Sequence, residues 1–279
     1  MRKSSNDKYL RKNLRAFYLG VALSLTPLLG HAGTDDTKST TVTVPAPPPA
    51  EEPFVTGELT VNYDTHFISY GRDVWQIGNS WDKALVHPYV ELDFHLLPDL
   101  QFYVSTWMDI NSFADSNIGK NIQEVDVNAG FYYSLDKFKF QLGYGAWNYA
   151  SQTESVLETK VTYADGLINP FINLHSRLAI GSNIGLATGV VPQVGIAPGL
   201  SLGLVKVTFP VVLSFETNDY HGGDGGFGYV SAGVMTSTQL AKHLVFNLGA
   251  TYYHTNSTVE ALNPKSNFVT GRAGFTIPF

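Results

Sequence analysis

The chain has 279 residues, contains no cysteine and carries a formal net charge of −6. Without cysteine there is no disulfide, no thiolate metal ligand and no cysteine nucleophile. The acidic balance argues against nucleic acid as a partner, because phosphate binding requires a basic surface.

Residues 1–32 have the pattern of an export signal. Residues 1–15 hold six basic residues and one acid, and the apolar stretch "AFYLGVALSLTPLLG" and a small-residue cleavage site with Gly30 and Ala32 follow. The apolar stretch contains Pro27 and is shorter than the roughly 20 residues of a spanning helix. We therefore expect a signal peptide cleaved near Ala32. Its loss removes six bases and one acid, so the formal charge changes from −6 to −11.

Residues 33–53, "GTDDTKSTTVTVPAPPPAEEP", are rich in Thr, Pro and Ala and lack aromatic residues. This composition predicts a disordered periplasmic linker with polyproline character. The folded domain is then expected over 54–279, which is long enough for one large sheet or barrel.

From residue 54 onward, apolar and polar residues alternate over stretches of ten to fourteen residues. In "VHPYVELDFHL", for example, Val90, Leu92 and Phe94 alternate with Glu91 and Asp93. A soluble sandwich has strands of about five to six residues, whereas a strand that crosses a bilayer needs about 9–11. The pattern therefore predicts an all-β fold, a transmembrane antiparallel up-and-down β-barrel with an apolar outer face and a polar lumen.

Connection lengths predict the number of strands. With a first strand over about 54–70, long connections such as "RDVWQIGNSWDK" and "TNDYHGGDGG" alternate with short ones such as "LPDL" and "SLDK". Bacterial outer-membrane barrels have short periplasmic turns, longer external loops and an even strand number. We expect about twelve strands, with ten and fourteen as alternatives because Gly and Pro are frequent over 168–203. Trp107, Trp147, Tyr149, Tyr252 and Tyr253 fall near the long connections, where an interfacial aromatic girdle belongs.

The last residues, "GRAGFTIPF", form an alternating segment that ends on an aromatic residue. Together with the export signal and the long strands, this segment resembles bacterial outer-membrane porins. The resemblance implies an outer-membrane location, contact with outer-membrane lipid, and recognition by the barrel assembly machinery through Ala273, Phe275, Ile277 and Phe279. The stretches "YDTHFISYGRD" and "TYADGLINPFINL" are also similar to the TorF-type porin family, although Gly71-Arg72 reverses the family's Arg-Gly order.

The polar faces of the expected strands supply candidate lumen-lining residues that set selectivity. They are His87, Glu91, Asp93, His95, Asp109, Glu124, Asp126, Lys137, Lys139, Lys160, His175, Arg177, Lys206 and Arg272. The acids gather on the earlier strands and most of the bases on the later ones, which predicts a transverse field across a wet pore. We expect a porin for passive diffusion of small hydrophilic solutes or ions.

Two other functions stay open at this point. In a closed barrel the same charges pair across a narrow lumen, and the protein acts as a scaffold or surface-interaction protein. An outer-membrane enzyme is the third interpretation, but no nucleophile accompanies the histidines at a recognisable spacing. His87 and His95 lie about 26 Å apart on one strand and cannot share an ion. Asp219, His221 and Asp224 have side chains that bind cations, but a Gly-rich external loop explains their presence without a metal site. We therefore expect no enzymatic activity, no metal and no cofactor.

Overall fold

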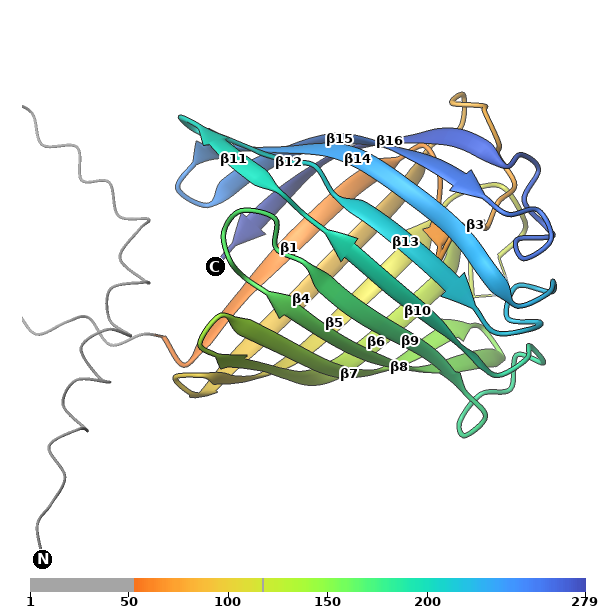
Figure 1. Cartoon of the computed structure of the whole chain (residues 1–279), viewed down its shortest axis with the longest axis horizontal. Coiled ribbons are helices and arrows are strands. Elements are labelled where there is room, and N and C mark those ends of the chain that lie inside the picture. Colours follow the sequence, from red (N-terminus) through yellow and green to blue (C-terminus); the bar gives the residue numbers. More distant parts are fainter. Residues whose placement is uncertain (1–52, 117) are drawn as a thin grey trace, which may run out of the picture. The chain divides into compact units, whose positions relative to one another are not determined.

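The computed structural model describes residues 53–279 with the exception of 117, and these residues form β-strands, turns and loops (Figure 1). The expected signal peptide over 1–32 and all but the last residue of the expected linker over 33–53 lie outside the described residues. Among the residues described, no helix is long and apolar enough to cross a bilayer. The strands are β1 (Val55–Asp64), β2 (Ile68–Ser69), β3 (Arg72–Asp73), β4 (Leu85–Leu97), β5 (Leu100–Ile110), β6 (Ile122–Leu135), β7 (Phe138–Tyr149), β8 (Gln152–Tyr163), β9 (Phe171–Leu178), β10 (Gly189–Ile196), β11 (Gly199–Leu202), β12 (Val205–Thr208), β13 (Val211–Glu216), β14 (Gly226–Ala241), β15 (Leu244–Thr255) and β16 (Asn267–Pro278).

Antiparallel pairing of the first and last long strands closes the sheet. Val61 of β1 lies opposite Phe275 of β16, and the ladder continues from β16 through β15 and β14 back to β4 and β1. β10 and β11 follow each other along one barrel strand, and β12 and β13 along the next, because β12 and β13 both pair with β14. The result is a closed barrel of twelve antiparallel strands, as predicted, and it has no free edge.

The two ends of the barrel differ in their connections. Both β1 and β16 have their terminal ends at the end with the short turns, which we call the short-turn end (Figure 1). The opposite end, the long-loop end, carries the connections over 65–84, 111–121, 179–188, 217–225 and 256–266. The expected alternation has exceptions, since only residues 150–151 connect β7 to β8 at the long-loop end, and 164–170 form a longer turn at the other. Residues 199–202, within the Gly- and Pro-rich region over 168–203, form strand β11.

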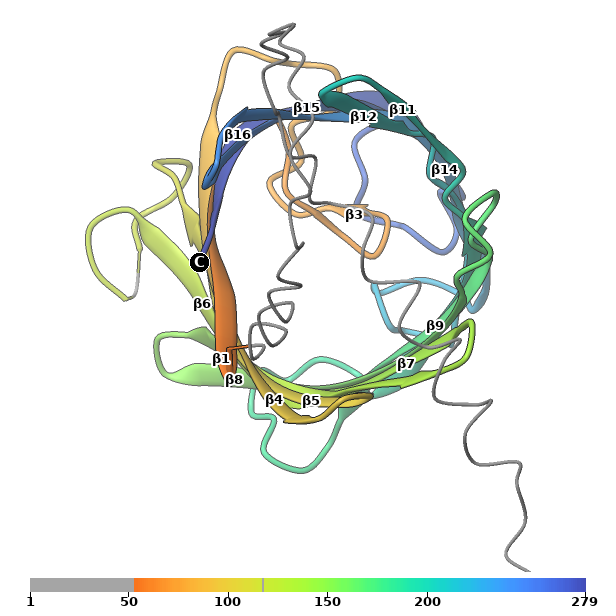
Figure 2. The same ribbon diagram turned by 90° about the vertical axis from the view of Figure 1, so that its left-hand side faces the viewer.

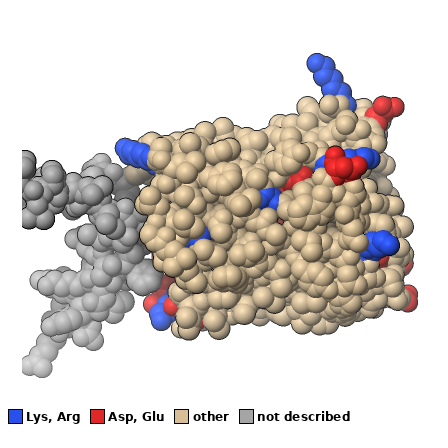
Figure 3. Space-filling model, turned by 90° about the horizontal axis from the view of Figure 1, so that it is seen from above, with Lys and Arg blue, Asp and Glu red and all other residues tan. Residues whose placement is uncertain are grey.

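The outer face of the barrel is apolar. Many outward side chains of the long strands are large, apolar and exposed, for example Leu59, Phe131, Leu142, Ile172 and Leu213. Figure 3 shows one side of this surface, on which residues other than Lys, Arg, Asp and Glu predominate. β4 to β8 have 11 to 14 residues each, which is enough for tilted strands to cross a hydrocarbon layer. A continuous apolar band of this kind is typical of a barrel that lies in a bilayer.

Inside the barrel, tyrosines fill the space that glycines leave. The ring of Tyr103 on β5 lies over Gly130 on β6 and Gly143 on β7, and a Cβ atom on Gly143 would lie 2.0 Å from the Tyr103 hydroxyl oxygen. Tyr103 also stacks on Tyr132, with ring centroids 4.5 Å apart. Glycine is therefore required at 143 by packing, because any side chain there displaces an aromatic ring.

Candidate functional site: the interior of the barrel

The first long connection folds into the barrel instead of extending the first strand. β1 ends at Asp64, so the predicted first strand over 54–70 is six residues too long. Within residues 65–84, which we call the inner loop, β2 and β3 pair as a small hairpin, and Figure 2 shows β3 inside the ring of barrel strands. The hairpin turns at Tyr70 and Gly71, with φ angles of 49° and 97°. Two successive positive φ angles are the signature of a type I′ turn, and the alternation at 63–70 gave no sign of it.

Tyr70, at the tip of this hairpin, contacts the opposite wall of the barrel. β9 lies six strands from β1 in the closed order of twelve, and the Tyr70 ring stacks on His175 of β9 with centroids 3.8 Å apart. The ring also stacks on Trp147 of β7, and the Tyr70 hydroxyl donates a hydrogen bond to Glu158 of β8. His175 bonds to the same carboxylate. The inner loop therefore reaches across the lumen.

The connection between β15 and β16 and the strand β14 hold the hairpin in place. Asn263, in the connection between β15 and β16, accepts a hydrogen bond from the Asp73 amide at 2.8 Å and donates one to the Gly71 carbonyl at 2.9 Å. A Cβ atom on Gly71 would lie 2.3 Å from the Tyr229 ring and 2.6 Å from Glu260, so the backbone packs closely on both. These contacts fix the hairpin from the side of the barrel opposite β7 and β8.

One buried polar network joins β16, β1, β4 and β5. Arg272 donates to Asp64 at 2.6 Å, and His87 Nδ1 donates to the other oxygen of Asp64 at 2.7 Å. The second ring nitrogen of His87 lies 3.3 Å from Asp109, which also accepts a hydrogen bond from Trp75 of the inner loop at 2.8 Å. Because His87, Asp64 and Asp109 are almost completely buried, each depends on its partner.

A second network lies on the opposite wall. Arg177 of β9 donates to Glu154 of β8 at 2.6 Å, and both side chains are buried. Its Nη1 donates to the carbonyl oxygens of Ala187 at 3.0 Å and Tyr220 at 2.8 Å, and the guanidinium lies 4.0 Å from the centroid of the Tyr220 ring. Tyr220 belongs to the connection 217–225, so this network fastens that loop over the barrel mouth.

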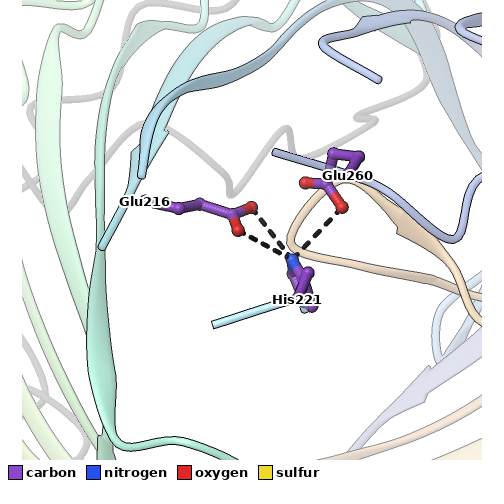
Figure 4. A group of neighbouring side chains, drawn as sticks. All are labelled: Glu216, His221 and Glu260. Atoms are coloured by element: carbon purple, nitrogen blue, oxygen red, sulfur yellow. Dashed lines mark hydrogen bonds and ion pairs between the residues drawn. The ribbon is translucent and has the colours of Figure 1, made fainter. Parts of the chain in front are cut away.

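A third cluster lies beside the second. His221 Nδ1 lies 2.9 Å and 3.0 Å from the two oxygens of Glu216, at the end of β13, and 3.2 Å from Glu260 (Figure 4). Burial raises the pKa of Glu260 above its ordinary value, and the neighbouring Glu216 adds to this. Burial lowers the pKa of His221, but the two carboxylates beside the ring outweigh this effect, and its pKa lies above the ordinary value.

The candidate lumen residues divide into two groups by position. The register places His87, Glu91, Asp93, His95, Asp109, Glu124, Asp126, Lys139, Lys160, His175, Arg177, Lys206 and Arg272 on the inner face. Lys137 lies in the turn between β6 and β7, outside any strand. Of the expected basic wall, Arg177, His175 and Arg272 each pair with an acid on a neighbouring strand.

The alternation pattern identified the inner faces but missed several interior residues. Asp64 was not predicted to line the lumen, because the first strand was expected to continue past it. Tyr70 was not predicted to enter the lumen, because it lies in a loop and not on a strand face. Trp107 and Trp147, expected in an interfacial girdle, point inward and pack on His87 and on Tyr70. Tyr253, also expected in the girdle, points inward and stacks on Phe268. An aromatic residue near a strand end is compatible with either face, and only the parity of its position distinguishes them.

The four residues at the end of β16 lie outside the lumen. Phe275 and Ile277 are exposed on the outer face, and Ala273 shares their parity. Phe279 follows β16, and its amide and carbonyl bond to Gly57 at 2.9 Å. A Cβ atom on Gly57 would lie 2.8 Å from the Phe279 ring, so the ring lies flat against the start of β1 on the outer face.

The space left inside the barrel is a series of adjoining cavities. A cavity of about 470 Å³ at the short-turn end is lined by Glu58, Asp93 and Glu91. Glu91 also lines a second cavity, of about 260 Å³, which extends to Tyr70. Tyr70 in turn borders a third cavity of about 310 Å³, and a fourth of the same volume shares Phe67 with the third and reaches Arg272. Residues of the inner loop line the last three of these cavities.

Comparison with family models gives no match, and no curated protein matches the sequence. Among solved structures, the chain is similar to the NanC porin at 10% identity, over 79% of this chain and 98% of the other, with a TM-score of 0.48. A KdgM porin matches at 8% identity, over 80% and 99%, with a TM-score of 0.47. Outer membrane phospholipase A from Escherichia coli matches at 13% identity, over 80% and 92%, with a TM-score of 0.40. Both porins and an enzyme occur at this level of similarity, which gives no information on activity.

Proposed function

We propose that this chain is a bacterial outer-membrane channel for passive diffusion of small hydrophilic solutes or ions, narrowed by the inner loop. The observation that carries the proposal is the contrast between the two faces of the barrel. The outer face is apolar, whereas charged and polar side chains line much of the inner face, and adjoining cavities run from Glu58 past Tyr70 to Arg272. The cavities favour a channel, because a closed barrel has the same polar lining but fills its lumen with paired charges.

The inner face has an excess of acid. Inward positions of the barrel strands hold ten carboxylates, Glu58, Asp64, Glu91, Asp93, Asp109, Glu124, Asp126, Glu154, Glu158 and Glu216, against five lysines and arginines, Lys139, Lys160, Arg177, Lys206 and Arg272. Rings and walls of carboxylates favour cations in aqueous pores. We therefore propose a preference for cations over anions.

A closed barrel that serves as a scaffold or surface-interaction protein is the second candidate. It is favoured by the contact of Tyr70 with the opposite wall and by the nearly complete burial of His175 and Arg177 at the long-loop end. Two described pairs bring a hydroxyl oxygen within hydrogen-bonding distance of an imidazole, Thr56 with His95 at 2.9 Å and Thr65 with His66 at 2.7 Å. The second ring nitrogen of each histidine bonds to Gln101 or to the Gly78 carbonyl oxygen and not to a carboxylate, so neither pair favours the enzyme interpretation. Similarity of "YDTHFISYGRD" to the TorF-type porin family stays a sequence prediction, and most of this stretch forms the inner loop instead of the first strand.

Planar-bilayer recordings of the refolded protein test the proposal. A channel gives discrete current steps and, in a salt gradient, a reversal potential of the sign expected for cations. Absence of current from protein whose β-structure is verified by circular dichroism would support the closed barrel. Anion preference would refute the charge argument while leaving the channel itself in place.

A further inference from the structure

Glu216, His221 and Glu260 form a compact group of metal-binding side chains at the long-loop end. One donor atom from each lies within 4.8 Å of the others, and all three side chains are buried. They come from three different segments, the end of β13, the connection 217–225 and the connection 256–266 (Figure 4). Bringing two buried carboxylates to one imidazole nitrogen is costly unless a positive charge lies among them.

The carboxylate of Glu260 is the second observation that points to a ligand. This side chain is 1% exposed, and within the described part of the chain neither of its oxygens has a hydrogen-bond partner. His221 Nδ1 lies 3.2 Å from its Oε2. A buried carboxylate without hydrogen bonds is unusual, since the loss of hydration is not compensated. Both oxygens of Glu216 face the same nitrogen.

We propose that Glu216, His221 and Glu260 bind a divalent first-row transition-metal ion such as Zn²⁺. One imidazole and two carboxylates are ligands that Zn²⁺ accepts, at about 2.0–2.2 Å each, and three protein ligands leave a position for water. In a tetrahedral arrangement such ligands lie about 3.3 Å apart, close to the present spacings between His221 and the carboxylates. The ion takes the place of a proton on His221 Nδ1.

Binding would fasten the inner loop. Glu260 packs against Gly71, and Asn263 of the same connection bonds to the backbone of Gly71 in the hairpin turn and of Asp73 in β3. An ion that ties Glu260 to β13 thus holds the connection that positions Tyr70. The proposal concerns binding and is independent of whether the barrel conducts.

Titration of the refolded, untagged protein with ZnCl₂, followed by isothermal calorimetry, tests this site. We expect one tightly bound ion per chain in the wild type and an affinity lower by about 100-fold or more in Glu260→Gln and His221→Gln, since loss of an outer-shell partner alone costs about 10–100-fold. His243→Gln and His254→Gln are matched controls, because both histidines are exposed and lie outside the cluster; their affinity stays at the wild-type value.

Two results would overturn the proposal: no binding to the wild type at millimolar Zn²⁺, or equal binding by the wild type and both cluster variants. Hydrogen exchange on the wild-type protein locates the site even where a variant does not fold. Zn²⁺ should slow exchange of amides in 217–225 and 256–266, and slowing confined to other segments would equally contradict the assignment. Co²⁺ substitution gives an independent signature through visible absorption bands of a low-coordinate N/O site.

Discussion

The ring of Tyr70 lies on the ring of His175 with centroids 3.8 Å apart and planes inclined by 23°, although the two residues belong to opposite sides of the barrel. This contact joins the tip of the inner loop to β9. Tyr70 lines both the cavity that extends from Glu91 and the one beside Trp147. The contact between Tyr70 and His175 therefore decides whether the lumen is continuous past the inner loop.

Replacing Tyr70 with alanine removes the ring that crosses the lumen. We expect Tyr70→Ala to raise single-channel conductance by about twofold, because the constriction widens while the lining charges stay. Tyr63→Ala is the matched control, since Tyr63 is exposed on the outer face of β1. Equal conductance in the wild type and Tyr70→Ala would show that the current does not pass this ring.

The lysines on the inner face near the short-turn end should reduce the preference for cations. Lys139 and Lys160 lie on inward positions of β7 and β8, and the double variant with both changed to Gln should shift the reversal potential further toward the cation value. Lys137→Gln, in the turn beside β7, serves as the control. A shift produced by the turn variant and not by the strand variant would contradict the register of the lining.

Substitutions in the buried pair of Arg177 and Glu154 should have non-additive effects on the free energy of unfolding. Arg177→Met leaves the Glu154 carboxylate buried without its partner, and we expect a loss of about 3–5 kcal/mol in the free energy of unfolding. Combining it with Glu154→Gln should restore most of that loss, because no unpaired charge remains. Unfolding of the micelle-bound protein by guanidinium chloride measures the free energy of unfolding of the single and the double variant. Additive losses in the double variant would mean that the pair is not coupled.

The close approach of Tyr103 to Gly143 makes a prediction about packing. Gly143→Ala places a Cβ atom 2.0 Å from the Tyr103 hydroxyl oxygen, whereas the next ring atom is 3.3 Å away. We expect Gly143→Ala to destabilise the barrel by about 1–3 kcal/mol in the wild type and by much less in a Tyr103→Phe background. Denaturant midpoints of the four proteins give the comparison. An equal destabilisation by Gly143→Ala in both backgrounds would show that the strain does not come from the Tyr103 hydroxyl.

Asp165 gives a pH dependence outside the barrel strands. Its Oδ1 accepts hydrogen bonds from the amides of Asn169, Leu167 and Ile168, at 2.9, 2.9 and 3.0 Å, and these bonds lower its pKa below the ordinary value of 3.8. The folded turn favours the ionised form, so its contribution to stability is present above pH 3.8 and is lost as the pH falls through the lower folded value.

Carboxyl-carbon NMR titration in micelles measures this pKa directly, and amide exchange at 167–169 should accelerate at the acidic end of the range. Asp165→Asn should remove the pH dependence of that exchange. An ordinary pKa for Asp165 would show that the three amides do not bond to it in solution.

The period-two alternation was sufficient to predict the barrel, its twelve strands and the inner face, because lipid and water impose opposite requirements on successive side chains. It could not predict the inner loop. Residues 65–70 continue the alternation past Asp64, and the turn at Tyr70 and Gly71 requires positive φ angles that Tyr rarely adopts. Nothing local distinguishes such a loop from a longer strand.

The ion pairs inside the barrel also could not be predicted from the sequence. Arg177, His175 and Arg272 looked like a basic wall because their partners Glu154, Glu158 and Asp64 lie on neighbouring strands, and strand register sets which charges meet. His221 was noted with Asp219 and Asp224 of its own loop, whereas its partners Glu216 and Glu260 come from a strand end and from a connection about 40 residues away.

The absence of cysteine from the sequence permits the most direct test of a passage beside the inner loop, since Tyr70→Cys supplies a single thiol. Current through this variant is recorded while a positively charged thiol reagent is added, with Tyr63→Cys on the outer face as the control. If ions pass the hairpin, modification of Cys at position 70 reduces the current and modification at position 63 leaves it unchanged. Unaltered current after complete modification at position 70, verified by mass spectrometry, would contradict a channel that runs past the inner loop.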